Sequence, residues 1–317
     1  MSSLALSIVI PTYRREQVLV DTVNALLPLM ETVHAQETDR CELLLIDQTP
    51  RHEPATESWL SELADAGRLR WLWLPTPHLT GAMNRGLLDA RGELVLYLDD
   101  DIIPAPGLLS GHLQAHARHP QAWAVVGQVL QPGQQPESHP HRPRGSALWR
   151  DLDFAFNGTE PAWIENVMAG NLSLKREQAL VLGGFDERFP PPVASRFETE
   201  FAKRLVAASG RIYFAPKASI HHLAATSGGT RSRGSHLTSA SPRYGVGDCY
   251  YALRRGRGWD RIWYLLRKPF REVRTRFHLQ HPWWIPVKLV GELRALCCAW
   301  KLWRLSPVLL AWDQQTT

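Results

Sequence analysis

The sequence has few cysteines, and their arrangement suggests neither a disulfide framework nor a zinc site. No CxxC pair and no even spacing occurs among the four, which are Cys41, Cys249, Cys297 and Cys298. Cys41 lies in an apolar run with the character of a strand, which favours a buried thiol. The sequence therefore predicts free thiols in a reducing compartment.

Long apolar runs are also missing, and no signal peptide is expected at the first residues. No window of 18 apolar residues occurs, so no segment is expected to span a bilayer. The first apolar stretch, LALSIVIP, lacks the basic region and the small-residue cleavage site of a signal peptide. We therefore interpret this stretch as a first strand and expect a cytoplasmic protein.

Charge is distributed unevenly along the 317 residues. Residues 223–317 hold 16 Lys and Arg against 5 Asp and Glu, a balance of +11, whereas residues 1–222 hold 20 against 26, a balance of −6. An acidic front part followed by a basic tail suggests two roles. One part would be catalytic, and the other would contact an anionic surface. Clustered arginine also suits nucleic acid, but the tryptophans among the arginines favour a lipid interface, so no nucleic-acid partner is expected.

The first 115 residues alternate between apolar runs of strand length and segments of helical character. Strands are expected at 4–10, 41–46, 68–74 and 92–98, with helices around 16–30, 55–66 and 81–90. This alternation predicts an α/β fold with a mainly parallel sheet flanked by helices. Residues 212–222 are expected to be extended, at an edge or irregular, because they contain Pro216.

Three aspartates follow an apolar strand in LVLYLDDDII, residues 94–103. Two unit charges about 5 Å apart repel by roughly 3 kcal/mol at an effective dielectric near 20, so the cluster needs compensation. Asp99 and Asp101 share one side of an extended segment and could both face Mg²⁺ or Mn²⁺ bound to a diphosphate. A capping turn is the alternative, because Asp caps helices well and Pro104 and Pro106 follow.

Several motifs, in this order, resemble those of family 2 nucleotide-sugar glycosyltransferases. LSIVIPTYRR is similar to the family's opening strand, ELLLIDQT to its second strand, and GELVLYLDDD to the strand before its Asp-x-Asp metal motif. LGGFDERF is similar to the end of its acceptor-half segment, and FETEFAKRL to its catalytic helix. The resemblance covers roughly residues 4–222 and implies a GT-A-type, Rossmann-like fold and inverting sugar transfer.

The resemblance implies roles for residues at matching positions. Tyr13 would stack on the nucleotide base, and Asp47 would accept a hydrogen bond from the base or the ribose. Asp101 would be the stronger ligand of Mg²⁺ or Mn²⁺, with Asp99 and His222 beside it. The other implied donor contacts are Pro11, Thr12, Asn84 and Asp100, and the implied acceptor-side or supporting residues are Gly170, Asn171, Glu200 and Arg204.

The resemblance also places the catalytic base at Glu198. Inverting transfer needs a carboxylate to take the proton of the acceptor hydroxyl while a metal stabilises the departing nucleoside diphosphate. Glu200 could pair with Arg204 and so is the more structural of the two acids, and a solvated helix face is the alternative for both. The family has Asp at the base position and an acid before it, where this chain has Glu198 and Phe197.

The basic tail holds seven of the 13 tryptophans within residues 244–317. An apolar face recurs there at helical steps of four and three, made of Leu289, Leu293, Leu296, Trp300 and Trp303. Such a helix suggests docking on an anionic membrane, and packing on the catalytic domain is the equal alternative. Upstream, Arg231 and Arg233 could close over the diphosphate as a lid.

These observations predict a metal-dependent inverting glycosyltransferase, peripheral on the inner face of the plasma membrane. It would move a sugar from a nucleoside diphosphate-sugar to a hydroxyl of a saccharide or lipid-linked acceptor, in cell-surface polysaccharide or glycolipid synthesis. The expected parts are a nucleotide-sugar-binding half (1–115), an acceptor-binding half (116–222) and a mobile loop with a helical basic C-terminal extension (223–317). A catalytically inactive, sugar-nucleotide-binding regulator is the alternative, because it would need no base.

Overall fold

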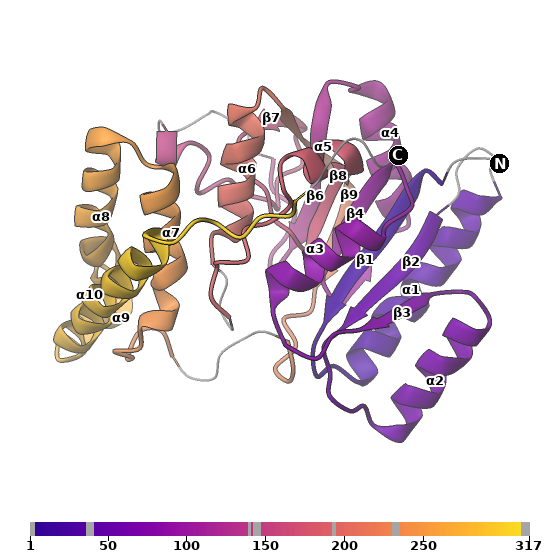
Figure 1. The fold of residues 1–317 in the computed structure, drawn as a ribbon, viewed down its shortest axis with the longest axis horizontal. Coiled ribbons are helices and arrows are strands. Elements are labelled where there is room, and N and C mark those ends of the chain that lie inside the picture. Colours follow the sequence, from indigo (N-terminus) through magenta and orange to yellow (C-terminus); the bar gives the residue numbers. More distant parts are fainter. Residues whose placement is uncertain are drawn as a thin grey trace.

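The computed structural model describes residues 4–35, 41–138, 141, 147–191, 195–229 and 235–311. Within these residues, nine strands form one sheet: β1 (Leu6–Thr12), β2 (Cys41–Asp47), β3 (Arg70–Trp73), β4 (Leu94–Leu98), β5 (Ile102–Pro104), β6 (Ala122–Leu130), β7 (Ala162–Ile164), β8 (Asn171–Lys175) and β9 (Arg211–His222). The strand order is β3-β2-β1-β4-β8-β6-β9-β5, with β7 paired to β9. The sheet therefore runs through both expected halves of the catalytic part (Figure 1).

The direction of the strands changes midway across the sheet. β3, β2, β1 and β4 are parallel, with Thr12 opposite Asp47 at the carboxyl ends of β1 and β2. β8 then runs antiparallel to both β4 and β6. The expected α/β sheet flanked by helices is confirmed, and beyond β4 it is mixed.

β9 lies inside the sheet, which corrects the expectation of an edge for residues 212–222. It pairs with β6 on one side and with β5 and β7 on the other. The register with β6 jumps between Gly127–Ala215 and Gln128–Ser219, so Pro216 falls in a bulge. A bulge accommodates proline within a strand because the extra residues leave the hydrogen-bonded ladder.

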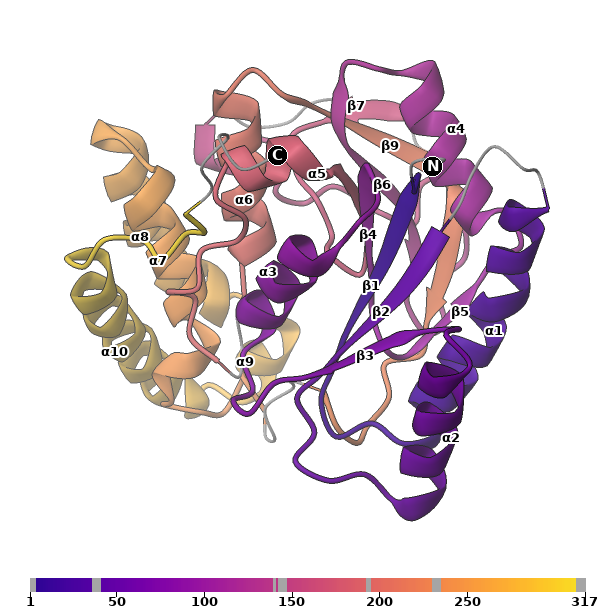
Figure 2. The same cartoon turned by 45° about the vertical axis from the view of Figure 1, so that its right-hand side comes forward.

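Helices cover both faces of the sheet (Figure 2). Those of the first two thirds are α1 (Gln17–His34), α2 (Pro54–Asp65), α3 (Leu79–Asp89), α4 (Leu108–Arg118), α5 (Arg176–Val181) and α6 (Phe197–Ala207). α1 and α4 pack on one face, and α3 and α5 on the other. α1 buries an apolar stripe at helical spacing, formed by Leu19, Val23, Leu26 and Met30, and so shields the strands from water.

The C-terminal helices form a separate layer that packs beside α6. They are α7 (Val246–Arg255), α8 (Gly258–Val273), α9 (Arg276–Gln280) and α10 (Trp284–Trp303). α7 contacts α6, and α8 and α10 lie on the outer side of α7 (Figures 1 and 2). In the described part of the chain, no helix combines the length and the apolar character needed to cross a membrane.

α10 packs on this layer through a face that is rotated from the expected one, although Leu296 and Trp303 of the expected face are partly buried against the core. Its buried residues are Lys288, Gly291, Glu292, Ala295 and Ala299, and the small side chains at 291, 295 and 299 allow a close approach to α7. Leu293 and Trp300, from the expected apolar face, are 62% and 51% exposed. The helix therefore packs on the protein and also keeps apolar side chains on its outer side.

Candidate active site

The fold brings His222 beside the aspartate triplet. β4 ends at Leu98, the chain turns through Asp99–Asp101, and β5 then runs antiparallel to the end of β9. In this register Ile102 lies opposite His222. Residues separated by more than a hundred positions thus meet at the carboxyl end of β4, where ligands bind in open α/β sheets.

Three side chains that can ligate a metal ion converge at this point. The ligand atoms of Asp99, Asp101 and His222 lie within 4.8 Å of one another. His222 Nε2 is 3.1 Å from Asp101 Oδ1 and 3.6 Å from Asp99 Oδ2, and the Asp99 side chain is 48% exposed. Gly170 leaves the space for Asp99, since a Cβ on Gly170 would lie 2.2 Å from Asp99 Oδ2. Carboxylate oxygens and one imidazole form a donor set that suits Mg²⁺ or Mn²⁺.

Arg15 compensates the buried charge of the triplet, a role that sequence reasoning missed. Its Nε donates to Asp100 Oδ1 and its guanidinium nitrogen Nη2 to Asp101 Oδ2, both at 3.1 Å. The Thr12 hydroxyl donates to the other oxygen of Asp100 at 2.8 Å. Burial raises the pKa of Asp100 to about 6, against the lowering effect of Arg15 and Thr12. Spacing in the sequence gave no signal for Arg15, because its partners lie 85 and 86 positions away.

A segment after β9 closes one side of the cluster. The backbone N–H of Ala225 donates to Asp101 Oδ2 at 2.8 Å, and that of Gly229 donates to the Tyr13 carbonyl at 2.7 Å. Gly228 has a φ of +70°, and a Cβ there would lie 2.0 Å from the Arg14 carbonyl oxygen. The expected lid residues, Arg231 and Arg233, lie outside the described part of the chain.

A pocket of about 200 Å³ opens beside the cluster. Of the expected donor contacts, Pro11, Thr12 and Tyr13 line it, together with all three aspartates and His222. Gln48, which the sequence analysis did not select, also lines this pocket, as does Arg15. The expected donor residues from β1 and β4 are therefore brought together.

Asp47 is not part of this pocket, although it ends β2 at the same edge. The residue is completely buried, and its Oδ2 accepts hydrogen bonds from His52 Nε2 at 2.8 Å and Trp71 Nε1 at 2.9 Å. Its Oδ1 accepts from the Thr49 N–H at 2.8 Å. Burial would raise the pKa of Asp47, but the hydrogen bonds from His52, Thr49 and Trp71 hold it below its usual range. Asp47 thus stabilises the end of β2 as an ionised, fully bonded group.

Asn84 is also buried, away from the cluster. Its side-chain amide donates to the Phe185 carbonyl and to Glu187 Oε1, both at 2.8 Å, and its oxygen accepts from the Phe185 N–H. These bonds connect α3 to the turn of the GGFDE motif. The structure places Asn84 as a brace between two segments.

A second pocket of about 180 Å³ adjoins the first. The two share Pro11, Leu79 and Asp99, and the second also contains Gly170 and Glu198. Glu198 is partly buried in the first turn of α6. Burial and the charge of Asp99 raise the pKa of Glu198 to about 7, against the lowering effect of Arg196. A carboxyl group with this pKa can accept a proton near neutral pH.

The remaining residues of α6 hold the helix in place. Arg204 Nε donates to both oxygens of Glu200, at 3.0 and 2.9 Å. Its Nη1 and Nη2 atoms donate to the carbonyls of Leu182 and Gly184, both at 2.6 Å. Phe197, where the family has an acid, is buried against Phe185 with ring centroids 5.6 Å apart. α6 is therefore anchored by Arg204 and Phe197, which fixes the position of Glu198.

Asn171 supports the middle of the sheet. It is fully buried, and its amide donates to the carbonyls of Gln128 at 3.0 Å and Ala218 at 2.8 Å. Its oxygen lies 2.8 Å from His112 Nε2. Asn171 thus connects β8 to β6 and β9 one residue beyond Gly170.

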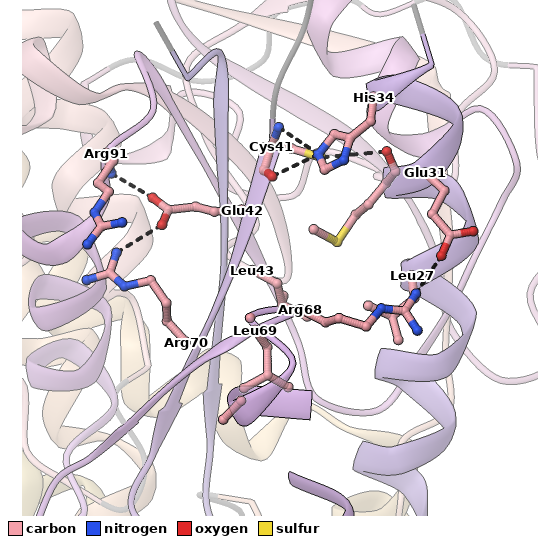
Figure 3. Close-up of a pocket in the computed structure, with 13 residues that line it drawn as sticks. Leu27, Glu31, His34, Cys41, Glu42, Leu43, Arg68, Leu69, Arg70 and Arg91 are labelled. Atoms are coloured by element: carbon pink, nitrogen blue, oxygen red, sulfur yellow. Dashed lines mark hydrogen bonds and ion pairs between the residues drawn. The ribbon is translucent and has the colours of Figure 1, made fainter. Parts of the chain in front are cut away.

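A further cavity of about 500 Å³ lies at the amino ends of the strands, away from the cluster (Figure 3). Arg70 and the N–H of Arg91 bond to Glu42 there, and Arg68 pairs with Glu31. Residues 36–40, which follow α1 in the sequence and precede β2, are outside the described part of the chain. Glu31, Glu42, Arg68 and Arg70 are thus paired with one another, whereas ligands of open α/β sheets bind at the opposite, carboxyl edge.

Comparisons with solved structures find the same fold in chains of low sequence identity. The crystal structure of GalNAc-T7 with UDP, GalNAc and Mn²⁺ matches with a TM-score of 0.57 at 15% identity, over 88% of this chain and 58% of that chain. The structure of S. aureus TarS residues 1–349 matches with a TM-score of 0.57 at 14% identity, over 92% and 81% of the two chains. This chain thus spans somewhat over half the length of the GalNAc-T7 chain.

Comparison by sequence gives a match to a family model but none to an individual curated protein. No match was found among curated proteins. The sequence model of glycosyl transferase family 2 matches residues 7–179, which is more than half of the chain and includes β1 except for its first residue, β2, the aspartate triplet and Gly170. The chain belongs to glycosyl transferase family 2.

Proposed function

We propose that this protein is a metal-dependent inverting glycosyltransferase. It transfers a sugar from a nucleoside diphosphate-sugar to a hydroxyl of a saccharide or lipid-linked acceptor, in cell-surface polysaccharide or glycolipid synthesis. One observation carries the proposal: Asp99 belongs both to the cluster with Asp101 and His222 and to the pocket that contains Glu198. A group bound at the cluster is therefore next to a carboxyl group that can accept a proton.

Asp99, Asp101 and His222 would hold the metal ion. Arg15 and the Ala225 N–H occupy Oδ2 of Asp101, so its Oδ1 points towards His222. A bound Mg²⁺ or Mn²⁺ would supply positive charge to balance that of the departing diphosphate. The Mn²⁺ in the GalNAc-T7 structure supports this choice of metal, and the UDP in it supports a nucleotide donor.

The first pocket would bind the nucleotide. Tyr13 lies at its edge, where its ring can stack on a base, and Pro11 and Gln48 form the adjacent wall. Both carboxylate oxygens of Asp47 are bonded within the protein, whereas Gln48 lines this pocket, so we propose that Gln48 takes the base contact first expected of Asp47. The Oε1 of Gln48 accepts a hydrogen bond from the His78 N–H, so its amide nitrogen would donate to an acceptor on the base.

Glu198 would act as the general base. The acceptor hydroxyl would enter the second pocket, where the Glu198 carboxylate would take its proton as the oxygen attacks the anomeric carbon and the bond from that carbon to the diphosphate breaks. The neighbouring Arg204, Glu200 and Phe197 hold α6 in place, which keeps the distance from Glu198 to the donor sugar fixed.

Calorimetric titration of UDP, GDP and dTDP, with and without Mn²⁺, tests the donor site. Asp99→Asn changes an exposed member of the cluster, and Asp65→Asn is the matched control because Asp65 is exposed at the end of α2. We expect one nucleotide to bind only with Mn²⁺, Asp99→Asn to weaken it by at least about tenfold, and Asp65→Asn to leave it unchanged. Absence of binding by every nucleotide would overturn the proposal.

A catalytically inactive, sugar-nucleotide-binding regulator is the second candidate. The observation in its favour is Phe197, a buried aromatic residue where the family has an acid next to the base. Metal-dependent nucleotide binding without transfer to any saccharide or lipid-linked acceptor would favour the regulator. Transfer that Glu198→Gln abolishes would exclude it.

A further inference from the structure

α8 turns an apolar face away from the protein. Its exposed large apolar residues, between 45% and 70% exposed, are Trp259, Ile262, Trp263, Leu266 and Phe270. Ile262, Trp263, Leu266 and Phe270 lie three, four, seven and eleven positions after Trp259, so all five lie on one side of the helix. Tyr264 and Lys268, its two buried residues, lie on the opposite side. A surface helix normally buries its apolar stripe, and α8 exposes one that the sequence analysis did not identify.

α10 continues this apolar surface. Leu293 and Trp300 are 62% and 51% exposed, Val290 is 43% exposed, and Trp283 just before the helix is 64% exposed. These residues lie opposite the buried face formed by Gly291, Ala295 and Ala299. The two helices thus both expose large apolar side chains on the side away from α7.

The two exposed faces belong to one rigid unit. Lys268 on α8 pairs with Glu292 on α10, and Glu292 also pairs with Lys288 at 2.8 Å; all three side chains are buried. The Arg261 guanidinium lies 5.3 Å from the ring centroid of Trp303. Figures 1 and 2 both place α8 and α10 at the end of the molecule remote from α2. We call the outward faces of these two helices the α8–α10 surface.

The exposed charges around the α8–α10 surface are predominantly positive. Between residues 257 and 304, all of which are described, the exposed acidic residue is Asp260, and the exposed basic residues are Arg257, Arg267, Arg274, Arg276, Arg294, Lys301 and Arg304. A second copy of the chain would present the same positive charges and would be repelled. An anionic lipid surface would attract them, and tryptophan is favoured at the boundary between headgroups and acyl chains.

We propose that the α8–α10 surface docks the protein on an anionic lipid bilayer. Trp259, Leu266 and Phe270 enter the boundary of the bilayer, and the exposed basic residues contact the headgroups. This inference goes beyond the proposed function, because it concerns a surface outside both pockets. Docking and sugar transfer can be tested separately.

Flotation of the full-length protein with lipid vesicles tests the proposal. We expect binding to vesicles that contain phosphatidylglycerol, and much weaker binding to vesicles of phosphatidylcholine alone or at high salt. Trp259→Ser, Leu266→Ser and Phe270→Ser together should weaken binding by about 100-fold or more, since each buried apolar side chain contributes strongly. Lys301→Glu with Arg304→Glu should weaken it by at least about tenfold.

The matched control carries the same kind of substitution elsewhere. Ile103 and Val181 are 53% and 54% exposed on β5 and α5, so Ile103→Ser with Val181→Ser should leave vesicle binding unchanged. Wild-type protein that stays unbound with both kinds of vesicle would overturn the proposal. A wild-type dimer that the three α8 substitutions dissociate would also overturn it, because the surface would then bind a second copy.

Discussion

The Nε atom of Arg196 donates to Oδ1 of Asp248 at 2.9 Å, which connects α6 to α7. Arg196 has a left-handed backbone, with a φ of +68°, and lies two residues before Glu198. Asp248 also accepts from the Tyr264 hydroxyl at 2.8 Å and from the Arg271 guanidinium at 2.7 Å, both on α8. The first turn of the helix that carries Glu198 is therefore held by the same carboxylate that holds α8.

Asp248→Asn should destabilise the protein. Burial would raise the pKa of Asp248, but Arg196, Lys268 and Arg271 hold it below its usual range. Removing the carboxylate leaves the partly exposed Arg196 and Arg271 without their shared charged partner, at a cost of about 1.5–3 kcal/mol in the free energy of unfolding at neutral pH. Urea unfolding measures this loss, and kcat should also fall because Arg196 no longer fixes the start of α6.

The pH dependence of this loss has a defined sign. A carboxylate with a lowered folded-state pKa stabilises the protein above its unfolded pKa of about 3.9, and this stabilisation disappears as the pH falls through the folded pKa. The difference between wild type and Asp248→Asn should therefore shrink below about pH 4. Asp260→Asn, at an exposed position on α8, is the control and should change the free energy of unfolding by less than about 0.5 kcal/mol.

Glu198→Gln should remove catalysis while preserving donor binding. Loss of a general base lowers kcat by about 100-fold to 10,000-fold. Glu200→Gln on the same helix is the matched comparison: Glu200 is buried with Arg204 and Arg255, so its loss should lower the free energy of unfolding by about 3 kcal/mol. Steady-state kinetics and urea unfolding of both variants separate the two roles, and equal kcat in wild type and Glu198→Gln would exclude this base.

Catalysis should depend on the ionisation of Glu198. Its pKa is raised to about 7 by burial and by Asp99, so below this pH the group is protonated and cannot take a proton. We expect kcat/KM to fall about tenfold per pH unit on the acid side and to level off above the pKa. A metal ion that neutralises Asp99 should move the inflection in kcat to lower pH, and a pH profile that is flat through neutrality would contradict this assignment.

Arg15→Gln should destabilise the loop that carries the triplet. Asp100 and Asp101 would lose their shared buried cation, at a cost of about 3–5 kcal/mol in the free energy of unfolding. Arg14→Gln is the matched control, because Arg14 is exposed and adjacent in the chain, and it should cost less than about 0.5 kcal/mol. Chemical unfolding compares the two variants, and equal losses would show that Arg15 does not compensate the triplet.

His222→Gln should weaken metal binding, whereas His221→Gln should not. Adjacent residues of β9 point to opposite sides of the strand, and only His222 meets Asp101. Losing one of three ligands should raise the Mn²⁺ concentration needed for half-maximal nucleotide binding by at least about tenfold. Calorimetry at varied Mn²⁺ measures this, and the same Mn²⁺ requirement in both variants would exclude His222 as a ligand.

Strand ends were the most predictable part of the site. Apolar runs that stop at Pro11, Asp47 and Asp99 place polar residues at one edge of a parallel sheet, and the alternation of a strand puts Asp99 and Asp101 on one side. The position of His222 followed from a family resemblance, and the pairing of β5 with β9 supplies its physical cause. Local pattern suffices for the residues at the ends of β1, β2 and β4, because the position of each is fixed by its own strand.

Burial of polar side chains was not predictable from the same pattern. Asp47 and Asn84 occupy the expected positions, yet their hydrogen-bonding groups are used by His52, Trp71 and Phe185. A strand or helix period shows which side of an element a residue faces, but not which distant donor lies there. Buried polar groups take whatever partner the packing provides, because leaving them unpaired is costly.

The sequence by itself determined the alternating α/β order, the acidic strand end, and the presence of a basic, tryptophan-rich helical tail. These depend on local periodicity and composition, which each segment carries alone. Only the tertiary structure decided that Arg15 holds the triplet, that β8 reverses direction, and that α8 and α10 turn apolar faces outward. Each of these depends on which segments become neighbours, since an amphipathic helix has an apolar side in any environment, and the rest of the fold decides whether that side is covered.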